Sequence, residues 1–411
     1  MIGIIADDVT GGTDAASACR DGGLRTVLTF GVPRPGRPMP HVDAHVVALK
    51  SRTQLVADAV EDSLRAMRSL IEQGADTIYV KYCSTFDSTP SGNIGPVVEA
   101  LAEELGAGAV VATPASPRHG RTVYRGHLFV GDVLLSDSHM RDHPLTPMRD
   151  ASVVRLLAVQ SGSAVERIDL SVVRSGPEAI ARADARATRH LVADATDDDD
   201  LLRLARASRG RRLLAGSAGL VGAIARDRAG KLLGAQSVRL PDRAAVLAGS
   251  CSVATLAQVE VFVDSGHPRF DLDVAGEPDA DRLAALALRW FDDKRAPGPV
   301  LISSSRSPAD LAGVHAALGA ERAAGIVERA IGLIAAGLVE RGIRRFVSAG
   351  GETSGAVVDA LKLSTGLIGR EAAAGVPWIH IDGDRPMAVL LKSGNFGDPE
   401  LLVRAATQEV S

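Results

Sequence analysis

The chain has 411 residues and a net charge of −4, with 46% hydrophobic and 23% charged residues. Its length predicts two or three domains, and its composition is that of a globular protein. The small acidic excess, with a pI of about 6.2, argues against a general nucleic-acid binder, which would carry a strong basic excess.

Cysteine usage and hydropathy indicate in which cellular compartment the protein is expected. Cys19, Cys83 and Cys251 are far apart and form no CxxC spacing, so we expect neither a disulfide framework nor a structural zinc site. The opening sequence MIGIIADDVTGG lacks the basic region of a signal peptide. No stretch approaches the roughly 18 uncharged apolar residues of a membrane span. We therefore expect a cytoplasmic protein with no membrane partner.

Short apolar runs alternate with helical-period segments along the first half of the chain. This alternation predicts a mostly parallel sheet covered by helices. Aromatic residues are only 3% of the chain, which suits the Ala/Val/Leu/Ile cores of such sheets. Amphipathic segments are expected at 57–72 and 97–105. The predicted strands are Ile2–Ala6, Thr26–Phe30, Val46–Leu49, Thr77–Lys81, Ala109–Ala112, Leu191–Ala193 and Leu213–Ala215.

Three segments depart from this alternation of apolar runs and helical-period segments. Residues 113–150 are rich in Pro, Arg and His, which predicts an irregular functional loop or lid. The run TDDDD at 196–200 predicts the start of a helix, with Thr196 or Asp197 as its cap. Residues 228–243 are basic and weakly periodic and indicate a domain boundary.

Further strands are predicted on the C-terminal side of this boundary. They are predicted at Ala245–Ala248, Val300–Ser303, Phe346–Ala349, Trp378–Ile381 and Val389–Lys392. We therefore expect two α/β domains, at about 1–230 and 244–411.

Polar residues of the first domain gather where strands are predicted to end. Asp7, Asp8 and Thr10 follow the first strand, where acids could bind a polyol or act as a general base. Helix capping explains the same residues. A second stretch offers Lys81, Ser84 and Thr85. A third offers Arg118 and Arg121, which suit a carboxylate or phosphate unless they only line a solvated loop.

Three segments of the second domain share the order strand, glycine- and hydroxyl-rich loop, helix. The loops are 249–252 (GSCS), 350–355 (GGETSG) and 392–397 (KSGNFG). In open parallel sheets, ligands bind beyond the carboxyl ends of the strands, where helices begin and present free N–H groups. Glycines let the backbone approach a phosphate. Each loop could equally be an ordinary turn, and none matches GxxxxGK[ST] or GxGxxG.

Separated motifs in this order resemble the four-carbon acid sugar kinase family. They are IADDVTGGTDAA, GSCSVATLAQV, AGGETSGAVVDAL, GVPW and LLKSGNFGDPELL, and they span nearly the whole chain. Three further segments resemble the 3-oxo-tetronate 4-kinase branch of this family. They are KYCSTFDSTPSGNIGPV, GRTVYRGHLFV and MRDHPLTPM. Gly12 stands where many relatives have Ala or Ser, a small departure.

The resemblance implies an α/β fold of two domains, an N-terminal one for the acid sugar and a C-terminal one for ATP, with the active site in the cleft between them. It implies ATP-dependent phosphorylation of the 4-hydroxyl of a 3-oxo-tetronate with Mg²⁺, whose ligands stay unknown. Asp8 is the expected base and Asp7 is expected to orient the substrate, and an exchange of these two roles stays open. The residues expected to bind substrate are Asp7, Asp8, Thr10, Lys81, Ser84, Thr85, Arg118 and Arg121. Those expected to bind nucleotide are Ser250, Ser252, Gly350, Gly351, Glu352, Thr353, Gly394 and Asn395.

Three alternatives stay open at this point. The first is a D-threonate or D-erythronate 4-kinase. The second is a non-catalytic ligand-sensing protein on the same scaffold, against which the paired acids speak. The third is a dehydrogenase, against which the missing dinucleotide fingerprint speaks. The oligomeric state is also open, with a homodimer as the candidate.

Overall fold

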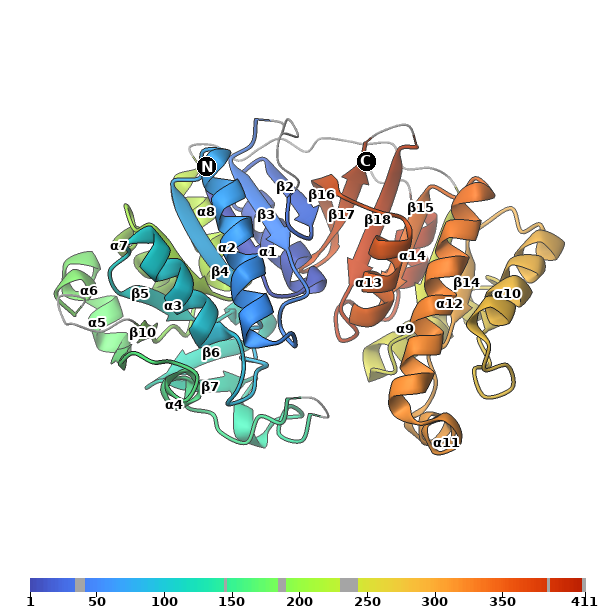
Figure 1. The fold of residues 1–411 in the computed structure, drawn as a ribbon, viewed down its shortest axis with the longest axis horizontal. Coiled ribbons are helices and arrows are strands. Elements are labelled where there is room, and N and C mark those ends of the chain that lie inside the picture. Colours follow the sequence, from blue (N-terminus) through green and yellow to red (C-terminus); the bar gives the residue numbers. More distant parts are fainter. Residues whose placement is uncertain (34–40, 144–145, 184–189, 230–242, 383–384, 409–411) are drawn as a thin grey trace. The chain divides into compact units, whose positions relative to one another are not determined.

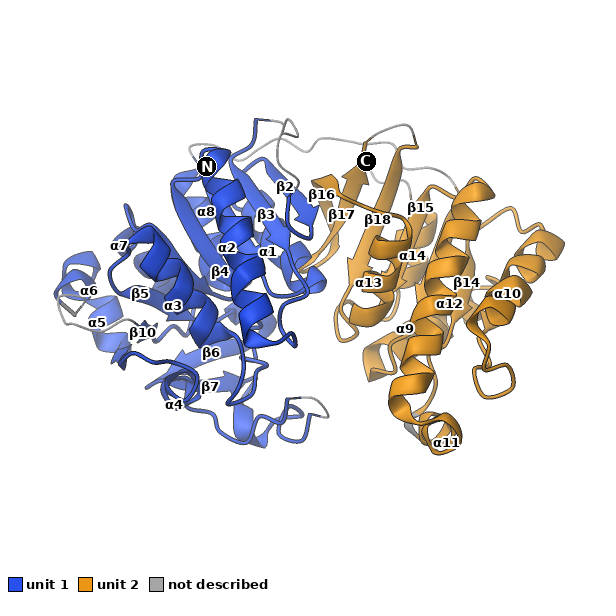
Figure 2. Cartoon of the chain, in the orientation of Figure 1, with its two compact units in different colours: residues 1–233 blue, residues 234–411 orange. Residues whose placement is uncertain are grey.

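The computed structural model describes residues 1–411 except 34–40, 144–145, 184–189, 230–242, 383–384 and 409–411 (Figure 1). It divides into two compact units, residues 1–233 and 234–411 (Figure 2). Most of the boundary segment expected at 228–243 lies outside the described residues. Both units are built of mostly parallel strands covered by helices, which confirms the predicted α/β class.

In the first unit, parallel strands lie in the order β2-β3-β1-β4-β11-β5-β10-β9. Strands β1, β3 and β4 are buried at every position, as expected for strands covered on both faces. Ala6 at the end of β1 is paired with Ala48 of β3 and Lys81 of β4, so the loops after these strands begin side by side. The bounds are β1 (Ile2–Ala6), β2 (Thr26–Phe30), β3 (Ala44–Ala48), β4 (Thr77–Lys81), β5 (Val110–Thr113), β9 (Val165–Ile168), β10 (His190–Ala193) and β11 (Leu213–Gly216).

Helices connect these strands and follow local signals in the sequence. The expected helix start at 196–200 is confirmed, because the Asp197 carboxylate accepts the Asp200 N–H at 2.7 Å. The helix predicted at 97–105 begins earlier, at Ile94, because Pro96 is tolerated in a first turn. The helices of this unit are α1 (Val9–Asp21), α2 (Val56–Glu72), α3 (Ile94–Leu105), α4 (Val153–Ala158), α5 (Leu170–Arg174), α6 (Pro177–Ala183), α7 (Asp198–Ala207) and α8 (Ala218–Arg228).

Residues 113–150, predicted to be irregular, hold a small antiparallel sheet. Its strands are β6 (Arg121–Tyr124), β7 (His127–Val130) and β8 (Val133–Leu134). The two residues between β6 and β7, Arg125 and Gly126, have φ values of 51° and 71°. Two successive residues in the left-handed region form the tight turn that suits a two-residue hairpin. The predicted irregular structure is therefore wrong for β6 and β7, because this turn pairs two short segments as antiparallel strands.

In the second unit, the strand order is β13-β14-β12-β15-β18-β17-β16. Five neighbouring strands of this sheet are parallel, in the order β13, β14, β12, β15 and β18. Strand β17 is antiparallel to both of its neighbours, β18 and β16. The core includes Phe262 and Trp378, both fully buried among aliphatic side chains. The bounds are β12 (Ala244–Ala248), β13 (Arg269–Asp271), β14 (Val300–Ser303), β15 (Arg345–Ala349), β16 (Thr365–Ala373), β17 (Val376–Ile381) and β18 (Met387–Lys392).

Three helices of the second unit begin shortly after the carboxyl ends of parallel strands. Helix α9 follows β12, α11 follows β14, and α13 follows β15. The bounds are α9 (Val253–Asp264), α10 (Ala280–Lys294), α11 (Pro308–Leu318), α12 (Ala320–Glu340), α13 (Gly351–Ala360) and α14 (Leu401–Thr407). Among the described residues of both units, no helix is long and apolar enough to cross a membrane.

Candidate functional site

Asp7 and Asp8 stand between the end of β1 and the start of α1, as the sequence predicts. Asp8 is the N-cap of α1: its Oδ1 accepts the Gly11 N–H at 2.8 Å, and its Oδ2 accepts the Thr10 hydroxyl at 2.8 Å. The capping role considered for these residues is therefore real for Asp8. With both oxygens engaged in these hydrogen bonds, the Asp8 side chain is still 27% exposed.

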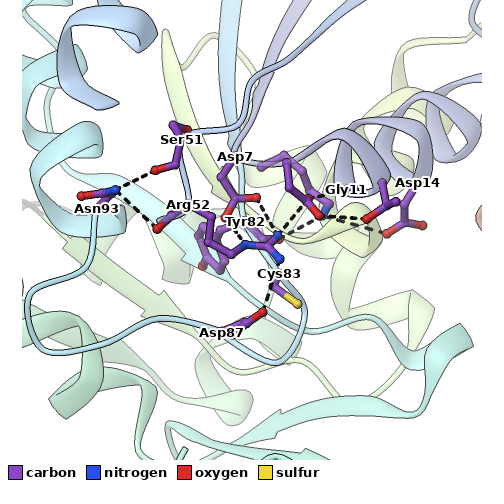
Figure 3. A network of polar contacts seen from close by, with 12 residues as sticks. Asp7, Gly11, Asp14, Ser51, Arg52, Tyr82, Cys83, Asp87 and Asn93 are labelled. Atoms are coloured by element: carbon purple, nitrogen blue, oxygen red, sulfur yellow. Dashed lines mark hydrogen bonds and ion pairs between the residues drawn. The ribbon is translucent and has the colours of Figure 1, made fainter. Parts of the chain in front are cut away.

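The acids are joined by an arginine that the sequence reasoning missed. Arg52 follows β3, which pairs with β1, and its guanidinium binds both oxygens of Asp7 at 2.9 Å (Figure 3). The same guanidinium lies 2.8 Å from Asp8 Oδ1 and 3.3 Å from Asp87 Oδ2. One cation thus connects three carboxylates from two loops, since Asp7 and Asp8 follow β1 and Asp87 follows β4. A basic residue just after a central strand was the available signal.

These contacts set the ionisation of the two acids differently. The pKa of Asp7 is raised, because the effect of burial is larger than the opposing effect of the Arg52 charge. Burial also acts on Asp8, but the charges of Arg52 and Lys81, with hydrogen bonds from Thr10 and Gly11, hold its pKa below the ordinary value. Asp8 is therefore ionised at neutral pH.

Lys81 ends β4 and is brought to the acids, as predicted. Its side chain is 3% exposed; its ammonium group lies 4.0 Å from Asp14 Oδ2 and donates to the Tyr82 carbonyl at 3.0 Å. Thr85 is buried in the following loop, where its hydroxyl lies 3.1 Å from Cys83 Sγ. Ser84 is half-buried beside it. These residues belong to the loop that also carries Asp87.

The two arginines expected to hold substrate form other contacts in this unit. Arg118 forms an ion pair with Asp21, the last residue of α1, whereas Asp8 stands before the first. Arg121 begins β6 and donates to the His119 carbonyl. Arg118 thus contacts the end of α1, and Arg121 contacts its own segment. Arg52 and Lys81 are the cations beside Asp7 and Asp8.

The loop that carries Arg52 is itself fixed by polar contacts (Figure 3). The amide nitrogen of Asn93 donates to the carbonyls of Ser51 at 2.6 Å and Gln54 at 3.0 Å. On the other side, the Thr146 hydroxyl donates to Asp87 and lies 2.9 Å from His143 Nδ1. The arrangement of charges is thus held from several segments, as a preformed polar site requires.

In the second unit, the three predicted loops lie on neighbouring strands, because β12, β15 and β18 are consecutive in the sheet. The Gly394 carbonyl accepts from the hydroxyls of Ser252 at 2.6 Å and Thr255 at 2.9 Å. Gln258 donates to the carbonyls of Phe396 and Asp398, at 3.0 Å each. The start of α9 therefore fixes the loop after β18.

Two glycines in these loops are required by close approach. A Cβ at Gly394 would collide with Ser250 Oγ and lie 3.1 Å from Ser252 Oγ. A Cβ at Gly249 would collide with Thr353 Oγ1. The hydroxyls of Ser250, Ser252 and Thr353 thus gather in a small space that only glycine backbone leaves open.

Helix α13 begins inside this cluster. Its N-cap is Gly350, and no side chain caps it. A Cβ at Gly351 would meet nothing within 4 Å, so open space lies in front of the first turn. Glu352 and Asn395 are both exposed, whereas Thr353 is 5% exposed. An uncapped helix start of this kind is suited to an anion.

Lys392 ends β18 beneath the same loops. Its side chain is fully buried, and its ammonium group donates to Thr255 Oγ1 at 2.8 Å and to the Gly394 carbonyl at 3.0 Å. Burial lowers its pKa to about 8. These contacts show a lysine that orders the loop.

Comparison with known proteins identifies the family. A model described as the sugar-binding N-terminal domain matches residues 2–224, and one described as the nucleotide-binding C-terminal domain matches residues 245–402. A 3-oxo-tetronate kinase of Methylobacterium radiotolerans is 46% identical over 419 residues, or 98% of each chain. The chain belongs to the four-carbon acid sugar kinase family, in its 3-oxo-tetronate kinase branch.

A second relative and a solved structure are also similar to this chain over nearly its full length. A 3-oxo-tetronate kinase of Pseudomonas fluorescens is 44% identical over 99% of this chain and 97% of its own length. A crystal structure from Salmonella typhimurium LT2 shares 39% identity and a TM-score of 0.89 over 98% of both chains. Within the part of the chain that the structure describes, no group of three or more His, Cys, Asp or Glu side chains is placed to hold a metal ion.

Proposed function

We propose that this chain transfers the γ-phosphate of ATP to the 4-hydroxyl of a 3-oxo-tetronate, of the 3-dehydro-erythronate type, and releases the 4-phosphate. The observation that carries the proposal is the full-length likeness to 3-oxo-tetronate kinases, at 40–46% identity for the first six relatives. The geometry supports it, because a cluster of acids and cations lies in the sugar-binding region and glycine-hydroxyl loops lie in the nucleotide-binding region.

In the second unit, the phosphates of ATP would meet the uncapped start of α13 at Gly350, Gly351, Glu352 and Thr353, together with the loop at Gly394 and Asn395. Ser250 and Ser252 would add hydroxyl contacts. The open space at Gly351 fits this role, because a phosphate needs the room that a side chain would fill. Mg²⁺ would neutralise phosphate charge, held mainly by phosphate oxygens and water rather than by a protein cage.

In the first unit, Asp7, Asp8, Thr10, Ser84 and Thr85 would face the polar groups of the acid sugar. The substrate carboxylate needs a cation, and Lys81 and Arg52 are the cations beside the acids. Arg52 is already shared among three carboxylates, so its first task is to hold Asp7 and Asp8 in place. Lys81 is therefore the better candidate for the carboxylate.

Asp8 would accept the proton of the attacking hydroxyl. It is ionised at neutral pH and more exposed than Asp7, whose two oxygens are both bound by Arg52. A low pKa suits this task, because phosphoryl transfer depends mainly on positioning and charge, with little demand on a strong base. Asp8→Asn should lower kcat by about 100-fold or more. Unchanged turnover would remove Asp8 from the chemistry.

The proposed activity is tested by ATP consumption with a panel of four-carbon acids. We expect kcat/KM to be highest for a 3-oxo-tetronate, with D-threonate and D-erythronate much poorer. A preference for either of these would make the chain a threonate or erythronate kinase. Binding of an acid without ATP consumption across the panel would favour the sensing protein.

A further inference from the structure

Beyond the loops discussed so far, a fourth loop lies at the same edge of the second unit. Strand β14 neighbours β12 and also ends at this edge. It is followed by Ser304, Ser305 and Arg306 and then by the cap of α11, Ser307. The Ser304 N–H donates to the Ala248 carbonyl at 2.8 Å, so this loop starts beside the one that begins at Gly249.

The hydroxyls of Ser304 and Ser305 stand out from the rest of this loop. Both Oγ atoms are buried without a hydrogen-bond partner among the described residues, and Ser305 is only 3% exposed. A buried hydroxyl without a partner is unfavourable, so such groups call for an explanation. Their neighbours are satisfied. Arg306 donates to the Leu272 carbonyl at 3.0 Å, and the Ser307 hydroxyl donates to Asp310 Oδ2 at 2.7 Å.

The position of Ser304 relates it to the cluster around α13. A Cβ at Gly249 would collide with Thr353 Oγ1 and would lie 3.4 Å from Ser304 Oγ. The hydroxyls of Ser304 and Thr353 therefore flank the same point, beside a glycine that leaves it clear. Thr353 lies in the first turn of α13, where the chain presents free N–H groups.

We propose that Ser304 and Ser305 are phosphate-binding residues of the nucleotide site, donating their hydroxyls to phosphate oxygens of ATP and ADP. This inference rests on the proposed function, since it assumes that the cluster at Gly249, Gly350 and Gly394 binds the nucleotide. The loop after β14 would then close one flank of the cluster. Serine suits this position, because a short hydroxyl can donate to an oxygen without filling the space that the phosphate needs.

The test is calorimetric titration of the full chain with ATP, ADP and adenosine, using Ser304→Ala and Ser305→Ala. Each substitution should weaken ATP and ADP binding by about tenfold, the effect of losing one hydrogen bond to a charged group. Adenosine binding should not change. Because each variant loses a buried hydroxyl that has no protein partner, its Tm without nucleotide should be equal to or above that of the parent chain.

Ser307→Ala is the matched control, because it removes a hydroxyl from the same loop that is already engaged in capping α11. It should lower Tm slightly and leave nucleotide affinity unchanged. Ser304→Cys and Ser305→Cys, which keep the volume and lose a strong donor, serve if an alanine variant fails to fold. Parental ATP affinity in the Ser304 and Ser305 variants would overturn this inference, as would an equal loss for adenosine. A parent chain that binds no ATP would instead overturn the proposed function.

Discussion

At the scale of a single residue, Lys392 orders the loop after β18 through its buried ammonium group, and burying this charge destabilises the folded state. It has no carboxylate within its described contacts, and it donates to one hydroxyl and one carbonyl. Its pKa falls from 10.5 to about 8 because burial disfavours the ammonium form. Below pH 8 the folded state therefore bears the cost of a buried charge that the unfolded chain avoids.

The pH dependence of stability follows with a definite sign. Between about pH 8 and pH 10.5 the unfolded chain keeps the Lys392 proton while the folded chain loses it, so the free energy of unfolding rises with pH. We expect the difference between the parent chain and Lys392→Met to shift by about 3 kcal/mol in favour of the parent across this window. Urea unfolding at several pH values measures it.

Lys294→Met, at an exposed position in α10, is the control for the general effect of removing a lysine. Its difference from the parent chain should stay constant across the window. A constant difference for Lys392→Met as well would show that the buried ammonium group does not titrate there.

The residues of the candidate site could be predicted in part. Asp7, Asp8 and Lys81 could be predicted from the sequence, because each lies at the end of an apolar run. The two strands that carry these runs are neighbours in the sheet. Arg52 was missed, because it lies three residues beyond the end of the predicted strand at Leu49. Its importance comes from reaching carboxylates at positions 7, 8 and 87, and contacts between distant segments are set by strand order.

At the scale of elements, the hairpin of β6 and β7 depends on one buried carboxylate. Asp194 follows β10 and accepts the N–H groups of Arg125 and Gly126 at 2.8 Å each, and that of Leu170 at 3.1 Å. It thereby fixes the left-handed turn to the large sheet. Neither the turn nor its anchor was visible in the sequence, because Asp194 is about 70 residues away from the hairpin.

Asp194→Ala should therefore destabilise the protein by about 3 kcal/mol, because one buried and two partly buried N–H groups lose a charged acceptor. Chemical denaturation of the full chain measures the loss. Asp169→Ala is the matched control. Asp169 is the N-cap residue of α5, but its side chain makes no capping hydrogen bond and forms an exposed ion pair with Arg167, so the substitution should cost less than about 1 kcal/mol. Similar small losses in both variants would contradict the anchoring role.

Other elements show where local pattern suffices and where it fails. Strands buried on both faces, such as β1, β4 and β14, were predicted at their observed bounds because their apolar runs are continuous. Strand β16 was missed because Gly366, Gly369 and Glu371 interrupt its apolar residues. It is held by antiparallel pairing with β17, which local sequence does not specify.

At the scale of the whole molecule, the two units carry different polar chemistry. The first gathers carboxylates and cations at the ends of β1, β3 and β4, and the second gathers glycines and hydroxyls at the ends of β14, β12, β15 and β18. Two domains were expected from the sequence, because new strands are predicted after a weakly periodic segment. The order of strands in each sheet was not, since neighbours in space are often distant in the chain.

If the division of chemistry reflects a division of binding, a variant in each unit should affect one ligand alone. Arg52→Lys keeps a positive charge but loses the planar fork that bridges three carboxylates. It should raise the KM for the acid sugar at least about tenfold, because two misplaced carboxylates face the ligand. The KM for ATP should change by less than about twofold.

Gly351→Val should have the reverse effect. Its side chain would extend into open space before α13, so the fold accommodates it while the phosphate position is blocked. The KM for ATP should rise by about tenfold or more, with binding of the acid sugar preserved in equilibrium titration. Gly325→Val, at an exposed and equally open position of α12, should leave both unchanged. If Arg52→Lys and Gly351→Val each weakened both ligands equally, the assignment of one ligand to each unit would be wrong.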